Sequence, residues 1–267
     1  IEGLICFPYD SISKEIIEEG KNLKVISTYS VGFDHIDTEY AKKKKISVGF
    51  TPEVLTDATA DMAFSLLLDI ARRTTEGDKI IRDGKWKEIY GAFDYVGVDL
   101  QGKTIGILGL GRIGSTLAKR AKAFDMKIIY HNRKHVTKSK EKSLDAKYVS
   151  FEKLITESDF LSIHVPHTKE TDRLFNMKIF KKMKKSSFLI NTSRGKVVNE
   201  QDLAIALKKR IIAGAGLDVF EKEPIKKNHP LVKLSNIVLA PHIGSSTKET
   251  RIKMAEITVK NLNLGIN

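Results

Sequence analysis

Two patterns of apolar residues alternate along this chain: short continuous apolar runs, and segments whose apolar residues recur at helical spacing. From Lys103 onward, short runs rich in Val, Ile and Leu are separated by segments whose apolar residues recur at helical spacing. This alternation is typical of a parallel sheet covered by helices on both faces. The runs that predict strands are 104–108, 127–131, 148–150, 160–165, 188–191, 213–217 and 237–240. The pattern therefore predicts an α/β fold with a doubly wound parallel-sheet domain.

Two of the intervening segments carry clear helical signals. Segment 115–124 gathers its apolar residues on one face, and Asn199 is a suitable N-cap for a helix over 200–209. Gly195 and Gly214 are expected in turns, where the missing Cβ is useful.

The first hundred residues repeat the alternation more weakly, with strand candidates at 4–7, 24–28 and 46–50. The long amphipathic stretch 57–86 follows and is interpreted as a helical connection between two domains. Its residues Met62, Leu66, Leu67 and Ile70 share one face. We therefore expect a substrate domain at 1–58 with a return segment at 250–267, and a dinucleotide-binding domain at 59–249.

Composition narrows the class of protein. With 267 residues, of which 41% are hydrophobic, the chain can bury a real core. The net charge of +13 raises the possibility of nucleic acid as a partner, but the cations fall in short groups at the expected polar ends of helices. We therefore predict no nucleic-acid partner. No run of eighteen apolar residues is present, so we predict no membrane partner and a cytoplasmic location.

Cysteine and histidine spacing gives no metal site. Cys6 is the single cysteine, which excludes an internal disulfide and a cysteine zinc cage. His164 and His167 have a spacing that could hold a metal, but a proline lies between them and no third ligand is evident. No metal is therefore predicted.

The strongest local motif is a glycine-rich turn between a predicted strand and a predicted helix. It reads Gly109, Leu110, Gly111, Arg112, Ile113, Gly114. The first glycine permits the tight turn, the second lets the backbone approach a pyrophosphate, and the third lets helix and strand pack closely. In this context the motif predicts dinucleotide binding.

The end of the second strand of this domain bears on which dinucleotide is bound. An acidic residue is usual there, because it accepts hydrogen bonds from the adenosine ribose. Here Asn132 stands in that place, followed by Arg133 and Lys134. A neutral amide removes repulsion of a 2′-phosphate and the two cations can pair with it, which favours NADP(H) and leaves NAD(H) possible. The alternative is that both cations are ordinary surface residues.

Three loops after later strands offer groups for a substrate. Arg194, Glu223 and His242 follow strands at 188–191, 213–217 and 237–240, so all three fall on the same edge as the glycine turn. Arginine can hold a carboxylate in two hydrogen bonds, and histidine can exchange a proton with an oxygen while a carboxylate holds its tautomer. Each residue alone has an ordinary structural explanation, but together they predict an acid/base site.

Several long motifs in order resemble the D-isomer-specific 2-hydroxyacid dehydrogenases over essentially the whole chain. They are STYSVGFDHID, TPEVLTDATADMAFSLLLDIARR, GKTIGILGLGRIG, INTSRGKVVNEQDL, AGAGLDVFEKEP and LAPHIGSST. The second motif, together with the basic "NRK", is most similar to the glyoxylate/hydroxypyruvate reductases. The resemblance implies two Rossmann-like domains, the smaller one flavodoxin-like, a small 2-oxo or 2-hydroxy acid as substrate, and a homodimer.

The resemblance also implies residue roles. Arg194 would bind the substrate carboxylate, His242 would be the acid/base and Glu223 its partner, while the backbone at Val31 and Gly32 would contact the same carboxylate. The positions that would contact the cofactor are Leu110, Arg112, Ile113, Thr59, Thr192, Ser193, Asp218 and Gly244.

Two alternatives stay open at this point: a phosphoglycerate dehydrogenase-like enzyme, and a non-enzymatic nucleotide-sensing corepressor on the same fold.

Family members begin some tens of residues earlier, so we expect the N-terminal part of the substrate domain to be missing.

Overall fold

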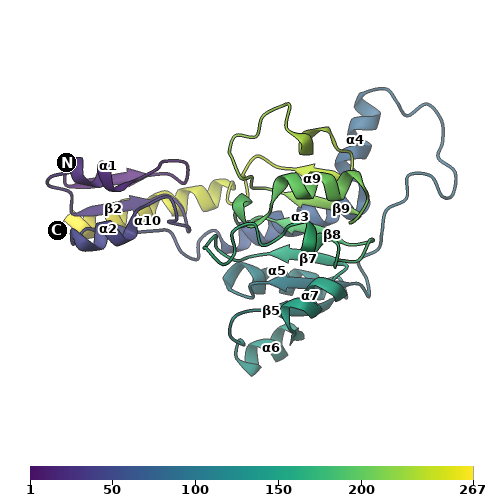
Figure 1. The fold of residues 1–267 in the computed structure, drawn as a ribbon, viewed down its shortest axis with the longest axis horizontal. Helices are drawn as coiled ribbons and strands as arrows, with labels where there is room; N and C mark the ends of the chain where they lie inside the picture. Colours follow the sequence, from purple (N-terminus) through teal and green to yellow (C-terminus); the bar gives the residue numbers. More distant parts are fainter. Residues whose placement is uncertain (267) are drawn as a thin grey trace. The chain divides into compact units, whose positions relative to one another are not determined.

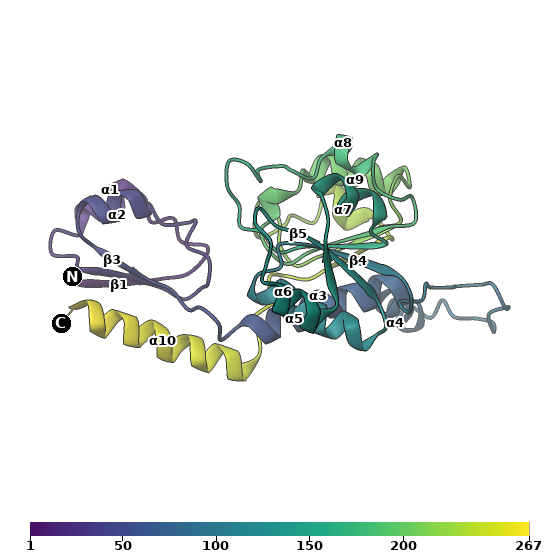
Figure 2. The same ribbon diagram turned by 90° about the horizontal axis from the view of Figure 1, so that it is seen from below.

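The computed structural model describes residues 1–266, which fall into two compact units (Figures 1 and 2). The smaller unit contains Ile1–Ala58 and the described residues from Ser245 onward, and the larger contains Thr59–Gly244. The chain returns to the smaller unit at Ser245 rather than at 250. The reason is local: helix α10 (Lys248–Ile266) takes the preceding residues as its cap, and the hydroxyl of Thr247 accepts a hydrogen bond from the Thr250 N–H.

The larger unit is built on a seven-stranded parallel sheet. Its strands are β4 (Thr104–Leu108), β5 (Lys127–His131), β6 (Ala146–Tyr148), β7 (Phe160–Ile163), β8 (Phe188–Asn191), β9 (Gly214–Leu217) and β10 (Ile237–Leu239). Their order in the sheet is β10-β9-β8-β7-β4-β5-β6, with every pair parallel. The order reverses between β4 and β7, which confirms the predicted doubly wound domain. In such sheets ligands bind outside the carboxyl ends of the strands at this reversal.

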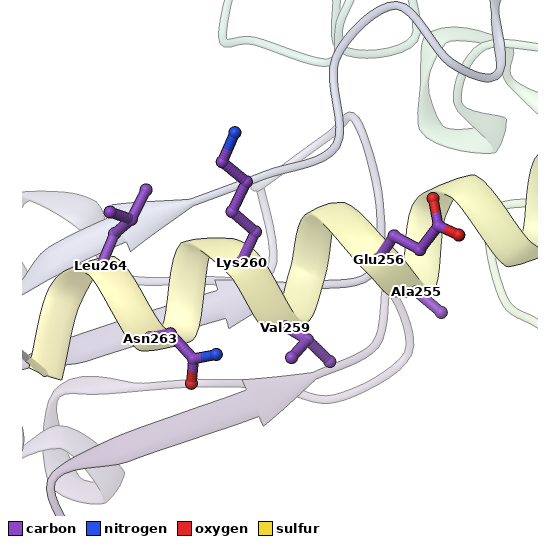
Figure 3. Close-up of a pocket in the computed structure, with 6 residues that line it drawn as sticks. All are labelled: Ala255, Glu256, Val259, Lys260, Asn263 and Leu264. Atoms are coloured by element: carbon purple, nitrogen blue, oxygen red, sulfur yellow. The ribbon is translucent and has the colours of Figure 1, made fainter.

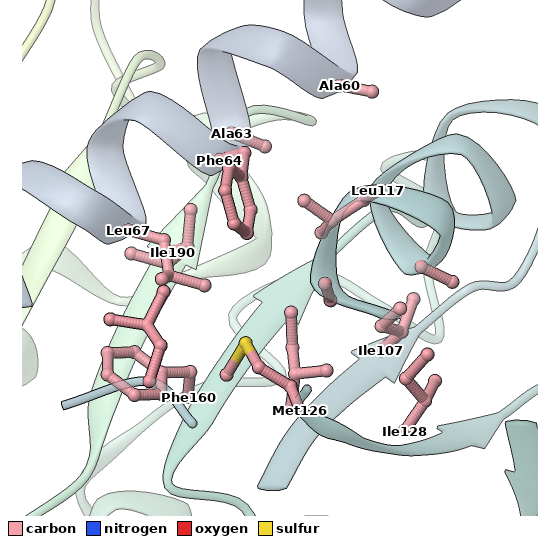
Figure 4. Close-up of a cluster of buried hydrophobic side chains, with 14 of the residues drawn as sticks. Ala60, Ala63, Phe64, Leu67, Ile107, Leu117, Met126, Ile128, Phe160 and Ile190 are labelled. Atoms are coloured by element: carbon pink, nitrogen blue, oxygen red, sulfur yellow. The ribbon is translucent and has the colours of Figure 1, made fainter. Parts of the chain in front are cut away.

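Helices cover both faces of this sheet because alternate strand residues point to opposite sides. The elements are α3 (Thr56–Arg72), α4 (Thr74–Arg82), α5 (Arg112–Ala123), α6 (Lys138–Leu144), α7 (Phe151–Glu157), α8 (Met177–Phe180) and α9 (Glu200–Lys208), with 3₁₀ turns at Gly195–Val197 and Pro230–Lys233. Ile107 joins the core cluster that contains residues of α3 and α5, and Leu108 joins the one with residues of α7 and α9. Figure 4 shows Phe64 and Leu67 of α3 in the first cluster.

The stretch predicted as a helical connection between domains is partly that: α3 begins at Thr56 in the smaller unit and continues into the larger one. Its first part, α3, buries Leu66 and Leu67 in the core of the larger unit, so from Thr59 onward the stretch is a structural helix of that unit. A break follows at Arg73, whose φ of 58° lies in the left-handed region, and α4 starts at the next residue. An apolar periodicity alone does not reveal such a break.

Two smaller predictions are also wrong. Strand β6 covers Ala146–Tyr148 rather than 148–150, because the Ser150 hydroxyl accepts the Lys153 N–H and caps α7. Gly214 does not lie in a turn but begins β9. A Cβ there would meet the Asn236 carbonyl oxygen at 3.0 Å, so close packing rather than turn geometry favours glycine.

The smaller unit has a three-stranded parallel sheet in the order β1 (Gly3–Cys6), β2 (Val25–Thr28), β3 (Ser47–Gly49). The short helices α1 (Lys14–Glu19) and α2 (Thr38–Lys43) share a buried cluster with one face of the sheet. Helix α10 packs against the opposite face, close enough that a Cβ on Gly265 would lie 2.4 Å from the Val25 Cβ.

The outward side of α10 is partly apolar. Val259 is 48% exposed and Leu264 is 69% exposed. They border a surface hollow lined by Ala255, Glu256, Val259, Lys260, Asn263 and Leu264 (Figure 3).

Across residues 1–266, none of the helices combines the length and the apolar character that crossing a bilayer would require.

Candidate active site

Three neighbouring strands carry the candidate acid/base residues. Strands β8, β9 and β10 lie side by side in the sheet, and Arg194, Glu223 and His242 follow their carboxyl ends. The Nδ1 atom of His242 lies 2.6 Å from Oε2 of Glu223. The structure therefore brings into direct contact two residues that are nineteen positions apart in the sequence.

Glu223 is held as a charged carboxylate. Its Oε1 atom accepts a hydrogen bond of 2.9 Å from the Phe220 N–H. Burial alone would raise the pKa of Glu223, but the His242 hydrogen bond, the Phe220 N–H and the charges of His242 and Arg194 hold it below its ordinary value. An ionised Glu223 accepts the Nδ1–H of His242. This leaves Nε2 as the nitrogen that can give a proton to a ligand or take one from it.

The backbone at His242 is fixed by a buried acid. His242 has a φ of 54°, in the left-handed region that only a minority of non-glycine residues adopt. The carboxylate of Asp218, which is 1% exposed, accepts the next two backbone N–H groups: Ile243 donates to Oδ1 at 2.8 Å and Gly244 to Oδ2 at 2.7 Å. Burial raises the pKa of Asp218, and these two donors oppose that shift. Asp218 thus sets the path of the loop that presents His242.

The loop carrying Arg194 is fixed by a buried amide. Asn191, at the end of β8, accepts the Ser193 N–H at 3.0 Å through Oδ1, and its Nδ2 donates to the Arg194 carbonyl oxygen at 3.0 Å. Arg194 is half-buried, and its charge is one cause of the lowered pKa of Glu223. Gly195 follows where the loop after β9 passes closely, because a Cβ on Gly195 would lie 1.8 Å from the Phe220 carbonyl carbon.

The glycine turn has the shape that a dinucleotide requires. Gly109 has a φ of 98°, and a Cβ on it would lie 2.6 Å from the His164 carbonyl oxygen. A Cβ on Gly114 would lie 2.2 Å from the Gly109 carbonyl oxygen, so this glycine lets α5 pack against the turn. Gly111 faces open space and is exposed. A closed inner side and an open outer side fit a pyrophosphate lying against the backbone before α5.

Asn132 does more than replace an acid. Its Oδ1 atom accepts a hydrogen bond of 2.7 Å from the Leu110 N–H, so the end of β5 is tied to the glycine turn. Arg133 and Lys134 come directly after it and are exposed. Asn132 therefore contacts the turn directly, and Arg133 and Lys134 are the next two residues in the sequence. The exposed Arg112 and the half-buried Ile113 begin α5 at the other end of the turn.

Four further predicted cofactor positions lie at the same edge of the larger unit. A Cβ on Gly244 would lie 3.5 Å from Cγ2 of Thr59, so these two residues are neighbours. The Ser193 hydroxyl donates to Asn191, whereas the buried Thr192 hydroxyl oxygen has no hydrogen-bond partner among residues 1–266. A buried polar atom that lacks a partner is uncommon and fits a place where a ligand completes the site.

Val31 and Gly32 belong to the smaller unit, in the loop after β2. The Ser30 hydroxyl, itself bonded to Thr28, donates to the Gly32 carbonyl oxygen and shapes this loop. Their contact with a substrate carboxylate stays a prediction.

The histidines considered as metal ligands have other partners. Nε2 of His164 lies 2.8 Å from the Ser162 hydroxyl, and burial lowers the pKa of His164 to about 4. His167 pairs with Asp172 at 2.7 Å. In the described part of the chain, residues 1–266, no three His, Cys, Asp or Glu side chains gather as metal ligands would.

Sequence reasoning missed residues that hold the site from behind. The sequence predicts Asn191 only as the end of a strand and Glu200 only as the start of a helix. Glu200 is 6% exposed, and its Oε1 atom accepts the Glu221 N–H at 2.6 Å, two residues before Glu223. A polar residue in or beside an otherwise apolar strand, as in FLIN, is the one signal that could have indicated such a role.

Comparison with known proteins agrees with this geometry. Residues 64–244 match the family model "D-isomer specific 2-hydroxyacid dehydrogenase, NAD binding domain". A glyoxylate reductase from Thermococcus litoralis is 52% identical over 265 residues, which are 98% of this chain and 80% of that protein. The glycine turn therefore lies in a domain that binds a nicotinamide dinucleotide.

Solved structures give the same result. A glyoxylate reductase from Paecilomyes thermophila superposes with a TM-score of 0.90 at 34% identity, covering 100% of this chain and 81% of that one. An NADPH-dependent glyoxylate/hydroxypyruvate reductase from Sinorhizobium meliloti, in complex with NADP and malonate, has a TM-score of 0.90 at 33% identity, covering 98% and 80%. The chain thus belongs to the D-isomer-specific 2-hydroxyacid dehydrogenase family, where it is similar to the glyoxylate reductases.

Proposed function

We propose that this protein is an NADPH-preferring reductase of small 2-oxo acids, with glyoxylate or hydroxypyruvate as substrate. The observation that carries the proposal is the 2.6 Å contact between His242 and Glu223, with the charge of Arg194 acting on the same carboxylate. These groups follow strands of the sheet that also carries the glycine turn. The names of the similar reductases support the same substrate class.

The proposed roles follow from the chemistry of each side chain. The bound nicotinamide would supply the hydride for the keto carbon. His242 donates the proton to the keto oxygen, and Glu223 stabilises the imidazolium before that transfer. Arg194 binds the substrate carboxylate through its planar guanidinium and so orients the carbonyl. The product is a D-2-hydroxy acid.

The preference for NADPH rests on the end of β5. Asn132 is neutral, and its Oδ1 already accepts a hydrogen bond from the Leu110 N–H. It therefore does not offer a ribose 2′-hydroxyl the acceptor that a carboxylate in this place would offer. Arg133 and Lys134 are exposed cations at the same place and suit a phosphate dianion. NADH is the alternative cofactor.

A panel of 2-oxo acids tests this proposal. Oxidation of NADPH and of NADH is followed with glyoxylate, hydroxypyruvate, pyruvate and phosphohydroxypyruvate. A higher kcat/KM for glyoxylate or hydroxypyruvate with NADPH is the expected result, and an aldehyde of similar size without a carboxylate should be a poor substrate because Arg194 has nothing to bind. A preference for phosphohydroxypyruvate would instead support the phosphoglycerate dehydrogenase alternative, and absence of turnover would support the nucleotide-sensing corepressor.

We also propose a homodimer. The segment after α4 exposes an unusual number of large apolar side chains, namely Trp86, Ile89, Tyr90, Phe93, Val96 and Val98. Ile89 and Phe93 are each 91% exposed, and a cluster of this kind is typical of an interaction surface. Light scattering should give twice the mass of the chain, and Ile89→Asp with Phe93→Asp should give the monomer. A monomeric wild-type protein would overturn this part of the proposal.

A further inference from the structure

Lys140, in the first turn of α6, reaches back to the glycine turn. Its Nζ atom lies 3.4 Å from the Leu110 carbonyl oxygen. The N–H of Leu110 donates to Oδ1 of Asn132. Leu110 is therefore contacted on both its backbone groups, by Asn132 at its N–H and by Lys140 at its carbonyl oxygen, so the two side chains meet the same residue of the turn.

Lys140 carries a charge that the protein does not neutralise. Among residues 1–266, no carboxylate lies within ion-pair distance of its Nζ atom, and the side chain is half-buried. Burial, and to a smaller degree the charge of Lys119, lower the pKa of Lys140. A partly buried ammonium with another cation nearby is stabilised by any anion that comes to it.

The neighbouring residues indicate which anion this is. A pyrophosphate lies at the N-terminus of the helix after the turn, here α5, while the adenosine ribose lies at the end of the second strand, here Asn132. Lys140 shares Leu110 with Asn132, and so lies on the ribose side. A group there would meet a phosphate on the ribose 2′ position.

We propose that Lys140 is a further cofactor-specificity residue, whose ammonium binds the 2′-phosphate of NADP(H) together with Arg133 and Lys134. The inference rests on the proposed NADPH preference and adds to it a residue from a different element. Unlike the two exposed cations after β5, Lys140 is already held beside the turn by its contact with Leu110. Less side-chain freedom is then lost when the phosphate arrives.

Calorimetric binding of NADP⁺ and NAD⁺ to Lys140→Met tests this without measuring turnover. The two ligands differ only in the 2′-phosphate, and methionine keeps most of the apolar stem of lysine. A charge-assisted hydrogen bond contributes enough that the Kd for NADP⁺ should rise about tenfold or more, while the Kd for NAD⁺ stays unchanged. Lys138→Met, an exposed lysine on the same helix, is the matched control and should change neither. Lys140→Arg should retain NADP⁺ binding.

The outcomes separate this inference from the proposed function. Equal losses for NADP⁺ and NAD⁺ would mean that Lys140 only supports the turn, which overturns the inference, and so would no loss for either ligand. If the wild-type protein binds NAD⁺ as tightly as NADP⁺, the proposed cofactor preference itself fails, and this is seen before any variant is made.

Discussion

The two regions of the larger unit that are proposed to serve catalysis and adenosine binding are built in different ways. In the catalytic corner, formed by the loops after β8, β9 and β10, each loop is fixed from behind by a buried polar side chain, Asn191, Asp218 or Glu200. In the adenosine corner, formed by the glycine turn and the end of β5, Arg133 and Lys134 are exposed. Proton transfer requires atoms placed within hydrogen-bond distance, whereas a phosphate dianion can be met by long, mobile cations. The difference in construction fits the different tasks that we propose for the two regions.

Glu200 shows how far this support extends. Besides accepting the Glu221 N–H, it lies 3.3 Å from His229, and its own N–H donates to the Glu221 side chain at 3.2 Å. Burial raises the pKa of Glu200, so its ionised form is costly in the folded protein. Glu200 is kept at such a cost while it holds Glu221, two positions before Glu223, the proposed partner of His242. This indicates that the path of this loop matters more than local stability.

The strongest test of the catalytic corner is His242→Ala. Loss of the proton donor should lower kcat by about a hundredfold to ten-thousandfold, because that is the usual contribution of a positioned acid or base. Binding of NADP⁺, measured by calorimetry, should stay unchanged. His229→Ala removes a different histidine that also lies beside a carboxylate and should have a much smaller effect on kcat. Undiminished turnover in His242→Ala would refute the role proposed for this residue.

Asp218→Asn tests whether the support behind His242 is needed. The amide keeps one oxygen acceptor but presents an NH₂ group to a backbone N–H, so one of the two bonds that fix the His242 loop is lost. A displacement of this kind should lower kcat by about a hundredfold. The KM for the 2-oxo acid should change little, because Arg194 is on another loop.

A matched control for Asp218→Asn is Asp202→Asn. Asp202 also accepts a backbone N–H, that of Met177 at 2.8 Å, but it lies on α9 and outside the catalytic corner. If both variants lose activity equally, or if Asp218→Asn raises KM while leaving kcat intact, then Asp218 does not act by positioning His242.

The adenosine corner is tested by Asn132→Asp. Aspartate keeps the acceptor for the Leu110 N–H, so the turn should be preserved while a negative charge is added beside the 2′-phosphate. The ratio of kcat/KM for NADPH to that for NADH should fall by about tenfold to a hundredfold. An unchanged ratio would show that the end of β5 does not select the cofactor.

Most of the sheet could be predicted from the sequence. Strands such as 104–108 and 188–191 are buried on both faces, so their apolar runs are continuous and end where the strand ends. The wrong predictions concern residues whose conformation differs from that of the pattern around them. Ser150 follows a run typical of a strand but caps a helix, and Arg73 breaks a helix within a stretch of helical apolar spacing. Neither conformation is determined by local sequence alone.

The site shows the same division. Arg194, Glu223 and His242 could be singled out because their chemistry is distinctive and each follows a strand; their catalytic roles stay predictions. Asp218 accepts backbone groups 25 and 26 residues away, and Lys140 meets a carbonyl 30 residues away. Contacts of that length depend on the strand order of the folded sheet, which the sequence does not state.

The smallest expected effect comes from a half-buried carboxylate elsewhere in the sheet, and it tests whether a carboxylate that accepts backbone groups matters for function wherever it occurs. Asp159 lies at the opposite, amino edge of the same sheet, where it accepts the Thr104 N–H and the Lys184 ammonium, each at 2.8 Å. Burial alone would raise the pKa of Asp159, but these two donors outweigh it and hold the pKa below its ordinary value. A lowered pKa stabilises the fold above the pKa of the unfolded chain, and the stabilisation disappears as pH falls through the folded-state value.

Asp159→Asn should therefore lower the free energy of unfolding in urea by about 1 kcal/mol at neutral pH and leave kcat unchanged. The gap should close as the pH falls below the pKa of the unfolded chain and through the lowered pKa of the folded state. Glu157→Gln, which removes an exposed pair with Lys153, should cost about 0.3 kcal/mol. A loss of kcat in Asp159→Asn as large as that in Asp218→Asn would contradict the comparison, since carboxylates that accept backbone groups would then matter equally at both edges. A loss of stability alone would instead restrict the functional role of such support to the edge where proton transfer is proposed.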